Sequence, residues 1–157
     1  MTPQQDQALT KIAAASVVAE DQTGCPAELS AAQCIVESAW LTRCPGFNCF
    51  GIKATDTHAT YQLTKEYLNG QWQTMTLAFE AYDSLADCFI AHARLLQGGP
   101  YLPAWRQYQI DHNLDNLISG ICPIYATDPN YTKLITTLAH GPHVTAAIAQ
   151  ARSSSTS

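Results

Sequence analysis

Charged residues are scarce in this sequence. Asp, Glu, Lys and Arg together make up 13% of the 157 residues, about half of the ~25% that is typical of globular domains. Only eight residues are Lys or Arg, and the formal net charge is −5. A protein that binds nucleic acid needs clustered positive charge to follow the phosphate backbone. The composition therefore argues against a nucleic-acid partner.

Long hydrophobic runs are also absent. A membrane-spanning helix needs ~20 consecutive apolar residues, and no segment approaches that length, so we expect no insertion into a membrane. The first residues, Met1 to Gln7, lack the basic start and the apolar block of a signal peptide. Removal of a signal, export by another route and no export at all stay open.

Cysteine, in contrast, is well represented, and this favours an oxidising compartment. Six cysteines allow 15 complete pairings, and Cys44 and Cys49 are the best candidate pair because they flank a short Pro-Gly loop. Cys34 and Cys88 have an alternative role as small buried hydrophobic residues on helices. A zinc site is a weaker alternative, because the spacing from Cys44 to Cys49 is wide for a zinc knuckle and the histidines form no ligand motif.

The length and the hydrophobic share of 46% fit one domain with a substantial core. We expect a single domain over residues 1–151 and a disordered Ser-rich tail over 152–157. Asn69-Gly70 separates two runs of alternating polarity, 61–68 and 71–79, and so predicts a β-hairpin. The remaining segments read as helices, which makes the fold class α+β. The expected helices cover about 3–19, 26–41, 84–97, 102–108, 113–121, 128–140 and a short Ala-rich segment that ends near 151.

Glu37 is the first candidate catalytic residue. The helix expected over 26–41 is apolar almost all round, and its polar exceptions Ser30, Gln33 and Glu37 form a narrow stripe that Trp40 continues. One polar stripe on a buried helix indicates the floor of a cleft. A carboxyl group there would be partly desolvated, would have a raised pKa and would suit general-acid catalysis. Periodicity alone leaves open a surface Glu, or a buried Glu with a structural hydrogen bond.

Glu66 is the second candidate, in the first strand of the expected hairpin. It alternates with Lys65 and Tyr67, which point to the opposite face. A hairpin above a helical cleft would bring its carboxylate opposite Glu37, and glycoside hydrolysis uses such a pair. The alternative is a solvated strand residue.

The third cluster runs from Tyr125 to Tyr131. The Tyr125 hydroxyl can point into a cleft built by this loop, while Asp128 reads as the N-cap of the next helix and Tyr131 as a packing residue in its first turn. His92 falls on the core face of the helix expected over 84–97, and we expect it to be a hydrogen-bonded core or boundary residue.

Four segments, taken in order and spacing, resemble the glucosaminidase domains of glycoside hydrolase family 73, found in bacterial autolysins and in the peptidoglycan hydrolase of the flagellar rod. The resemblance covers about residues 8–139. Each motif is weak alone, but four in register are specific. The segments are Gln33-Cys-Ile-Val-Glu37-Ser-Ala-Trp40, Asn48-Cys-Phe-Gly-Ile-Lys-Ala54, Thr64-Lys-Glu66-Tyr-Leu-Asn-Gly70 with Phe79-Glu-Ala-Tyr-Asp-Ser84, and Tyr125-Ala-Thr-Asp-Pro-Asn-Tyr131.

The resemblance implies a lysozyme-like α+β fold and an endo-β-N-acetylglucosaminidase that cuts between N-acetylglucosamine and N-acetylmuramic acid in peptidoglycan. Glu37 matches the general acid of the family, Glu66 the second carboxylate, and Tyr125 the tyrosine of the Tyr-Ala-Thr motif. It implies no metal and no cofactor. The predicted substrate-binding set is Trp40, Asn48, Phe50 and Tyr131.

The expected partner is the glycan strand of peptidoglycan, met by a monomer in the periplasm or at the cell wall. Alternatives are a non-catalytic peptidoglycan-binding module, or the same chemistry delivered as a phage lysin or an interbacterial toxin. One departure concerns the Glu-Ser-Gly-Trp-Gly pattern of the family, whose glycines are Ala39 and Leu41 here. We expect Ala39 on a helix to be benign or mildly stabilising, and Leu41 to alter the exit of the helix.

Overall fold

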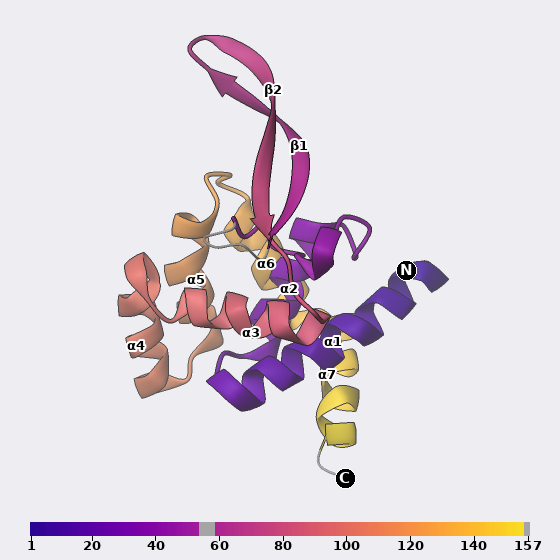
Figure 1. Ribbon diagram of the computed structural model, residues 1–157. Helices are drawn as coiled ribbons and strands as arrows, with labels where there is room; N and C mark the ends of the chain where they lie inside the picture. The colour runs from indigo at the N-terminus through magenta and orange to yellow at the C-terminus, as the bar shows by residue number, and fades with distance from the viewer. Residues whose placement is uncertain (54–58, 156–157) are drawn as a thin grey trace.

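A computed structural model describes residues 1–53 and 59–155, apart from the side chains of 59–64, 66 and 75–77. Helices form the body of the molecule, and one antiparallel hairpin projects from it (Figure 1). The expected α+β class is therefore confirmed. In the described ranges no helix is long and apolar enough to cross a membrane. The elements are α1 (Pro3–Thr23), α2 (Ala27–Ser38), η1 (Pro45–Phe47), β1 (Ala59–Leu68), β2 (Gln71–Glu80), α3 (Leu85–Leu96), η2 (Gly99–Tyr101), α4 (Leu102–Asp111), α5 (Leu114–Tyr125), α6 (Tyr131–His140) and α7 (Pro142–Ser155).

Helix α2 lies at the centre of the body, where α1, α3, α6 and α7 all contact it. Most of its side chains are buried, including the polar Gln33 and Ser38. The Ser38 hydroxyl compensates its burial by donating to the carbonyl of Cys34 over 2.6 Å. Glu37 is only half-buried. The expected buried helix is confirmed, but Ser30 and Gln33 of the predicted polar stripe are themselves buried and Trp40 lies beyond the end of the helix.

The end of α2 differs from the expectation. The helix stops at Ser38 instead of Leu41, and Ala39, Trp40 and Leu41 all have left-handed backbones with φ of 48°, 59° and 66°. Non-glycine residues seldom adopt this conformation. The Ser38 hydroxyl stabilises the turn by accepting from the N–H of Leu41 over 2.9 Å. The expectation that Ala39 lies on the helix is wrong, and the two missing glycines fall inside this left-handed turn.

The hairpin has the predicted turn. Leu68 pairs with Gln71, and Asn69 and Gly70 between them have φ of 53° and 78°. Positive φ at both positions is the type I′ geometry, whose twist matches that of the strands. At the base of the hairpin, the N–H of Glu80, the last residue of β2, donates to the carbonyl of Ile52 over 2.8 Å. The loop before the hairpin therefore supports the end of β2.

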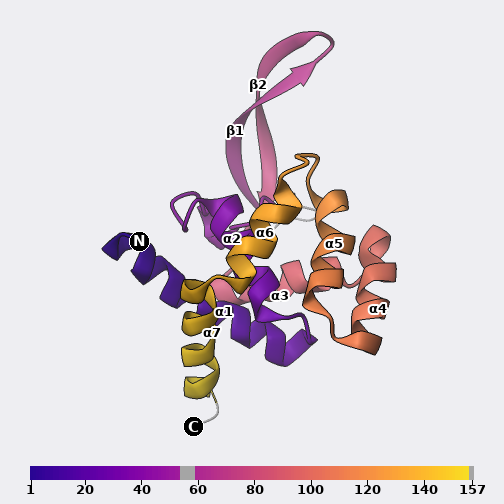
Figure 2. The same cartoon turned by 180° about the vertical axis from the view of Figure 1, so that it is seen from behind.

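The C-terminal helix is longer than expected. Helix α7 continues to Ser155, so the disordered tail predicted from 152 is wrong over 152–155, and 156–157 lie outside the described residues. Arg152 explains the difference, because its guanidinium contacts Glu20 of α1 at 2.6 Å and Glu28 of α2 at 2.8 Å. Figure 2 shows α7 and the C-terminus at the opposite end of the body from the hairpin.

The loop before α6 also differs from the prediction. Helix α5 runs on to Tyr125, and α6 begins at Tyr131 with Asn130 as its N-cap. Asp128 instead accepts from the N–H of Asn130 over 2.9 Å, which forms a turn one step before the helix. The prediction of Asp128 as the N-cap is therefore wrong.

The predicted disulfide between Cys44 and Cys49 is confirmed. Four further cysteines are free and fully buried. Among them, Cys34 on α2 and Cys88 on α3 occupy the core, as the interpretation of small hydrophobic residues predicts.

Candidate active site

The carboxyl group of Glu37 lies in the last turn of α2 and is partly withdrawn from solvent. Burial raises its pKa, and a hydrogen bond from the Tyr131 hydroxyl acts in the opposite direction without cancelling the rise. Desolvation disfavours the charged carboxylate, whereas the hydrogen bond stabilises it. Glu37 therefore holds its proton to higher pH than a surface Glu, as a general acid requires.

Tyr131 connects Glu37 to Gln33. The side-chain amide of Gln33 donates to the Tyr131 oxygen over 3.2 Å, which leaves the hydroxyl proton for Glu37. Gln33 and Glu37 are four residues apart on α2, so they share one helix face and reach the same tyrosine. Both Gln33 and Tyr131 are buried. The interpretation of Tyr131 as a packing residue was incomplete, because it also contacts the candidate acid.

Tyr125 completes this cluster from the end of α5. Its ring is stacked on that of Tyr131, with centroids 6.0 Å apart and an interplanar angle of 6°. Burial raises the pKa of Tyr125 and the nearby charge of Glu37 raises it further, so the phenol stays protonated and can act as a hydrogen-bond donor. The structure brings the predicted residues Glu37, Tyr125 and Tyr131 together.

Two more rings extend the cluster inward. His92 of α3 contacts Tyr125 edge to face, with centroids 5.8 Å apart, and is stacked on Phe50 at 3.7 Å. His92 is fully buried, and neither ring nitrogen has a hydrogen-bond partner within the described residues. Burial lowers its pKa to about 3, so the ring is neutral. The predicted core position is confirmed, but the predicted hydrogen bonding is not found there.

Asn48 binds the backbone of its own loop. Its amide nitrogen donates to the carbonyls of Ile52 (2.7 Å) and Glu80 (3.0 Å). Its oxygen accepts from the N–H groups of Phe50 (3.3 Å) and Ile52 (3.1 Å). This side chain therefore fixes Phe50 against the base of the hairpin. Contact of Asn48 or Phe50 with substrate stays a prediction.

Trp40 lines a hollow between the N-terminal residues and the end of α6. The left-handed turn after Ser38 directs it to a hollow lined by α1 and by the junction of α6 and α7, including Gln5, Leu138 and His143. Helical spacing had placed Trp40 one turn above Glu37, and the early end of α2 removes that relation. Its role in substrate binding stays a prediction.

Glu66 can be placed only by its backbone. It lies in β1 opposite Gln73, and its side chain lies outside the described residues. The hairpin rises from the end of the body where α2 and α6 lie, as both Figure 1 and Figure 2 show. The role of Glu66 as the second carboxylate stays a prediction.

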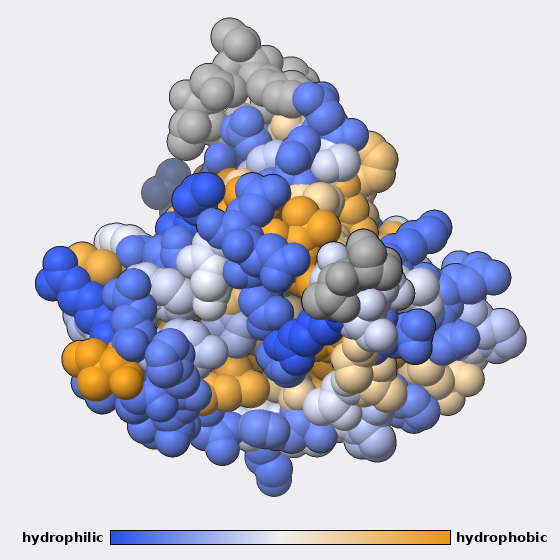
Figure 3. Space-filling view, turned by 90° about the horizontal axis from the view of Figure 1, so that it is seen from below, coloured by the Kyte–Doolittle hydropathy of each residue, from blue (hydrophilic) through white to orange (hydrophobic). Residues whose placement is uncertain are grey.

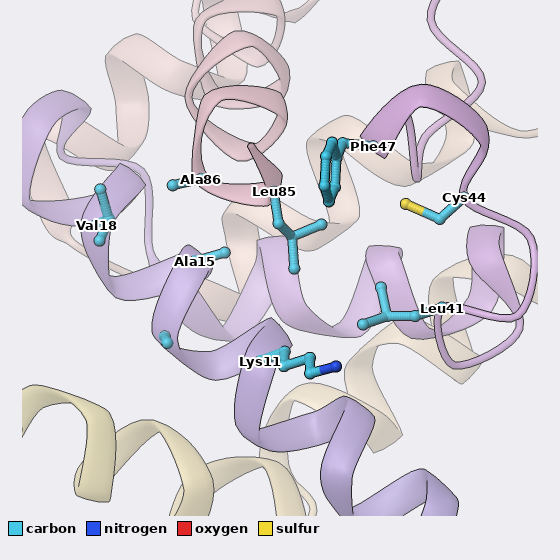
Figure 4. Close-up of a pocket in the computed structure, with 9 residues that line it drawn as sticks. Lys11, Ala15, Val18, Leu41, Cys44, Phe47, Leu85 and Ala86 are labelled. Atoms are coloured by element: carbon cyan, nitrogen blue, oxygen red, sulfur yellow. The ribbon is translucent and has the colours of Figure 1, made fainter. Parts of the chain in front are cut away.

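An apolar pocket lies elsewhere, between α1, the loop after α2 and the start of α3. Figure 4 shows Leu41, Phe47 and Leu85 around it, with Lys11 at its edge. On the face seen in Figure 3, hydrophobic patches lie between hydrophilic residues. Across the described part of the chain, no group of three or more His, Cys, Asp or Glu residues could hold a metal ion.

A half-buried carboxyl group with a raised pKa, beside tyrosines in a helical domain with one hairpin, is the arrangement expected of a lysozyme-like glycoside hydrolase. The chain belongs to the glucosaminidase family: the family profile described as mannosyl-glycoprotein endo-beta-N-acetylglucosaminidase matches residues 13–142. The resemblance seen in the sequence motifs is thereby confirmed.

Curated relatives share this region. A probable N-acetylmuramidase of Lactococcus lactis is 34% identical over 134 residues, which cover 78% of this chain and 30% of the relative. The peptidoglycan hydrolase FlgJ of Salmonella typhimurium is 28% identical over 144 residues, which cover 83% of this chain and 44% of FlgJ. The chain therefore spans less than half the length of these relatives.

Solved structures are similar in fold. A truncated glycoside hydrolase domain of Salmonella typhimurium FlgJ has a TM-score of 0.70 at 27% identity, covering 86% of this chain and 95% of that one. The catalytic domain of the autolysin Auto from Listeria monocytogenes has a TM-score of 0.79 at 23% identity, covering 94% of this chain and 89% of that one. These similarities confirm the expected lysozyme-like α+β fold.

Proposed function

We propose that this chain is a peptidoglycan hydrolase, an endo-β-N-acetylglucosaminidase that cuts the bond between N-acetylglucosamine and N-acetylmuramic acid. The observation that carries the proposal is the half-buried Glu37 carboxyl group beside the Tyr131 hydroxyl, with a raised pKa, in a chain whose residues 13–142 match the glucosaminidase family. The names of the relatives support peptidoglycan as the substrate, and the family description supports a β-N-acetylglucosaminide bond as the one that is cut.

Glu37 acts as the general acid. In its protonated form it donates to the glycosidic oxygen, and a carboxylate is left behind. The Tyr131 hydroxyl then stabilises that carboxylate, because its hydrogen bond favours the ionised form. Gln33 keeps Tyr131 in the donating orientation by occupying a lone pair of its oxygen.

The other half of the reaction is assigned to the hairpin and to Tyr125. Glu66 acts as the base on water, or stabilises the oxocarbenium-like transition state. Tyr125 orients the water or the N-acetyl group of the sugar. Inversion, retention and participation of the substrate acetamide are all compatible with these roles.

The test is an analysis of the products from purified peptidoglycan. Mass spectrometry of the released fragments should find new reducing-end N-acetylglucosamine. The Glu37→Gln chain should release none, whereas the matched surface variant Asp21→Asn should cut as the wild type does. Intact glycan with measurable binding would overturn the proposal in favour of a non-catalytic module.

A muramidase is the second candidate, because a relative at 34% identity is named a probable N-acetylmuramidase. The same experiment separates the two, since a muramidase leaves reducing-end N-acetylmuramic acid.

We propose a monomer that acts in the periplasm or at the cell wall, and the disulfide supports an oxidising compartment. An autolysin, a phage lysin and an interbacterial toxin would share this chemistry.

A further inference from the structure

Two large aromatic side chains are exposed near the tip of the hairpin. Tyr67 and Trp72 face each other across the strands, with 61% and 72% of their surfaces exposed. Their ring centroids are 5.3 Å apart, with an interplanar angle of 59°. A cross-strand aromatic pair stabilises a hairpin by a fraction of a kcal/mol, but it does not need to leave most of both rings in water.

Polar groups surround the pair. Lys65 lies two residues before Tyr67 and pairs with Thr74, which lies two residues after Trp72, so all four belong to one face of the hairpin. Lys65, Trp72, Gln73 and Thr74 line a hollow of about 570 Å³. This volume lies within the roughly 300–1,000 Å³ range of small-ligand sites.

The chemistry of this face fits a carbohydrate. The apolar C–H face of a sugar packs on an aromatic ring, and the side chains of Lys65 and Thr74, which pair on the same face, offer hydrogen bonds to acetamido and hydroxyl groups. Nucleic acid would need more positive charge, and Lys65 is the only cation between residues 65 and 74, where Glu66 offsets it. An uncharged chain of amino sugars therefore fits better than a polyanion.

We propose that Lys65, Tyr67 and Trp72 form a second glycan-binding surface, which takes a β-1,4-linked N-acetylated amino-sugar strand of polymeric peptidoglycan. The proposal rests on the proposed function. Tyr67 and Trp72 lie beside the turn of the projecting hairpin and Glu37 lies in the helical body (Figure 1), so the bound segment would be distinct from the bond being cut. Two linked contacts raise the apparent affinity for a polymer without affecting short fragments.

Binding is tested without turnover in the full Glu37→Gln chain. Co-sedimentation with insoluble purified peptidoglycan should weaken about fivefold or more when Trp72→Ala is added, as for the loss of one stacking contact. Trp72→Phe should keep most of the binding, because it keeps an aromatic face. Ile110→Ala, which removes another exposed hydrophobic side chain (77% exposed) on α4, is the matched control and should change nothing.

A spectroscopic readout identifies the ligand. The β-1,4-linked tetramer of N-acetylglucosamine should change the tryptophan emission of the Glu37→Gln chain, and Trp72→Phe should abolish that change. A free stem peptide should leave the emission unaltered. A response to the peptide and none to the tetramer would overturn the proposal.

Kinetics separate binding from support of the hairpin. In the active chain, Trp72→Ala should raise KM for polymeric peptidoglycan, leave kcat unchanged and spare the hydrolysis of short soluble glycans. Equal loss on short and long substrates would mean that Trp72 only supports the strand that carries Glu66. If no product forms but Trp72-dependent sedimentation remains, the proposed function fails and the surface stands; if products form and Trp72→Ala binds normally, only the surface fails.

Discussion

The Tyr131 hydroxyl hydrogen-bonds the Glu37 carboxylate and lowers a pKa that burial raises. The two residues come from α6 and α2, which pack against each other in the body. Burial is the larger influence on the pKa of Glu37, and the tyrosine offsets part of the rise. The relation can be tested by removing one oxygen atom.

Tyr131→Phe should move the pH profile of hydrolysis. Without the hydroxyl, the ionised form of Glu37 loses its hydrogen bond, so the pKa of Glu37 rises further. The reaction needs protonated Glu37, and the fall of kcat/KM on the alkaline side should therefore shift to higher pH. Tyr108→Phe on α4 is the matched control, and an unshifted profile for Tyr131→Phe would contradict the assignment.

Glu37→Gln should be inactive and yet more stable at neutral pH. Loss of a general acid costs roughly 10²–10⁴ in rate. Burial raises the pKa of Glu37 above its ordinary 4.5, so the folded chain holds this proton more tightly than the unfolded chain. The stability from Glu37 is present below pH 4.5 and is lost as pH rises through the raised pKa. In urea unfolding, the free energy of unfolding of Glu37→Gln should rise relative to that of the wild type between pH 4 and pH 7. A lower free energy of unfolding for the variant at pH 7 would speak against a desolvated carboxyl.

His92→Leu should make the fold less sensitive to acid. Burial lowers the pKa of His92 from 6.5 to about 3. Between these pH values the imidazole is protonated in the unfolded chain and neutral in the folded chain. Stability therefore falls as pH drops from about 6.5 to about 3, by up to ~1.4 kcal/mol per pH unit. Urea unfolding at pH 7, 5 and 4 should give a shallower loss for His92→Leu than for the wild type. The exposed control His143→Leu should keep the wild-type slope, and equal slopes in all three chains would sink the prediction.

Ala39→Gly should stabilise the protein. Ala39 has φ of 48°, a conformation in which a Cβ costs about 1–2 kcal/mol. Glycine avoids this cost, but its greater freedom in the unfolded chain reduces the net gain in stability. We expect a gain of about 0.5–1 kcal/mol, or a few degrees in Tm. The exposed helical control Ala146→Gly in α7 should instead lose about 1 kcal/mol. A loss of similar size in both variants would show that Ala39 is not under strain.

The parts that the sequence predicts well are those set by local chemistry. Asn69-Gly70 defines its turn by the φ values that the two residues tolerate, and the apolar composition of α2 marks it as buried. The Cys44–Cys49 pair follows from a five-residue separation. Each of these signals lies within one short segment, so a single sequence is sufficient to read it.

The parts that the sequence misses depend on tertiary contacts. Helix α2 ends at Ser38 although no glycine marks the stop. Trp40 is therefore not on the helix, and it lines the hollow beside Gln5 and Leu138. Arg152 orders its helix through carboxylates 132 and 124 residues away. The bond from Gln33 to Tyr131 spans 98 residues. The polar stripe on α2 had marked Gln33, but no local pattern reveals its partner.

The Asn48 side chain ties the base of the hairpin to the loop before it, through the carbonyls of Glu80 and Ile52. The strands are 10 residues long, which at about 3.3 Å per residue gives an arm of about 33 Å. A rotation of about 10° at the base would sweep the far end of this arm through about 6 Å. Because the Asn48 amide bonds to the short end of this arm, a small change in these hydrogen bonds would be amplified at Tyr67 and Trp72 near its far end.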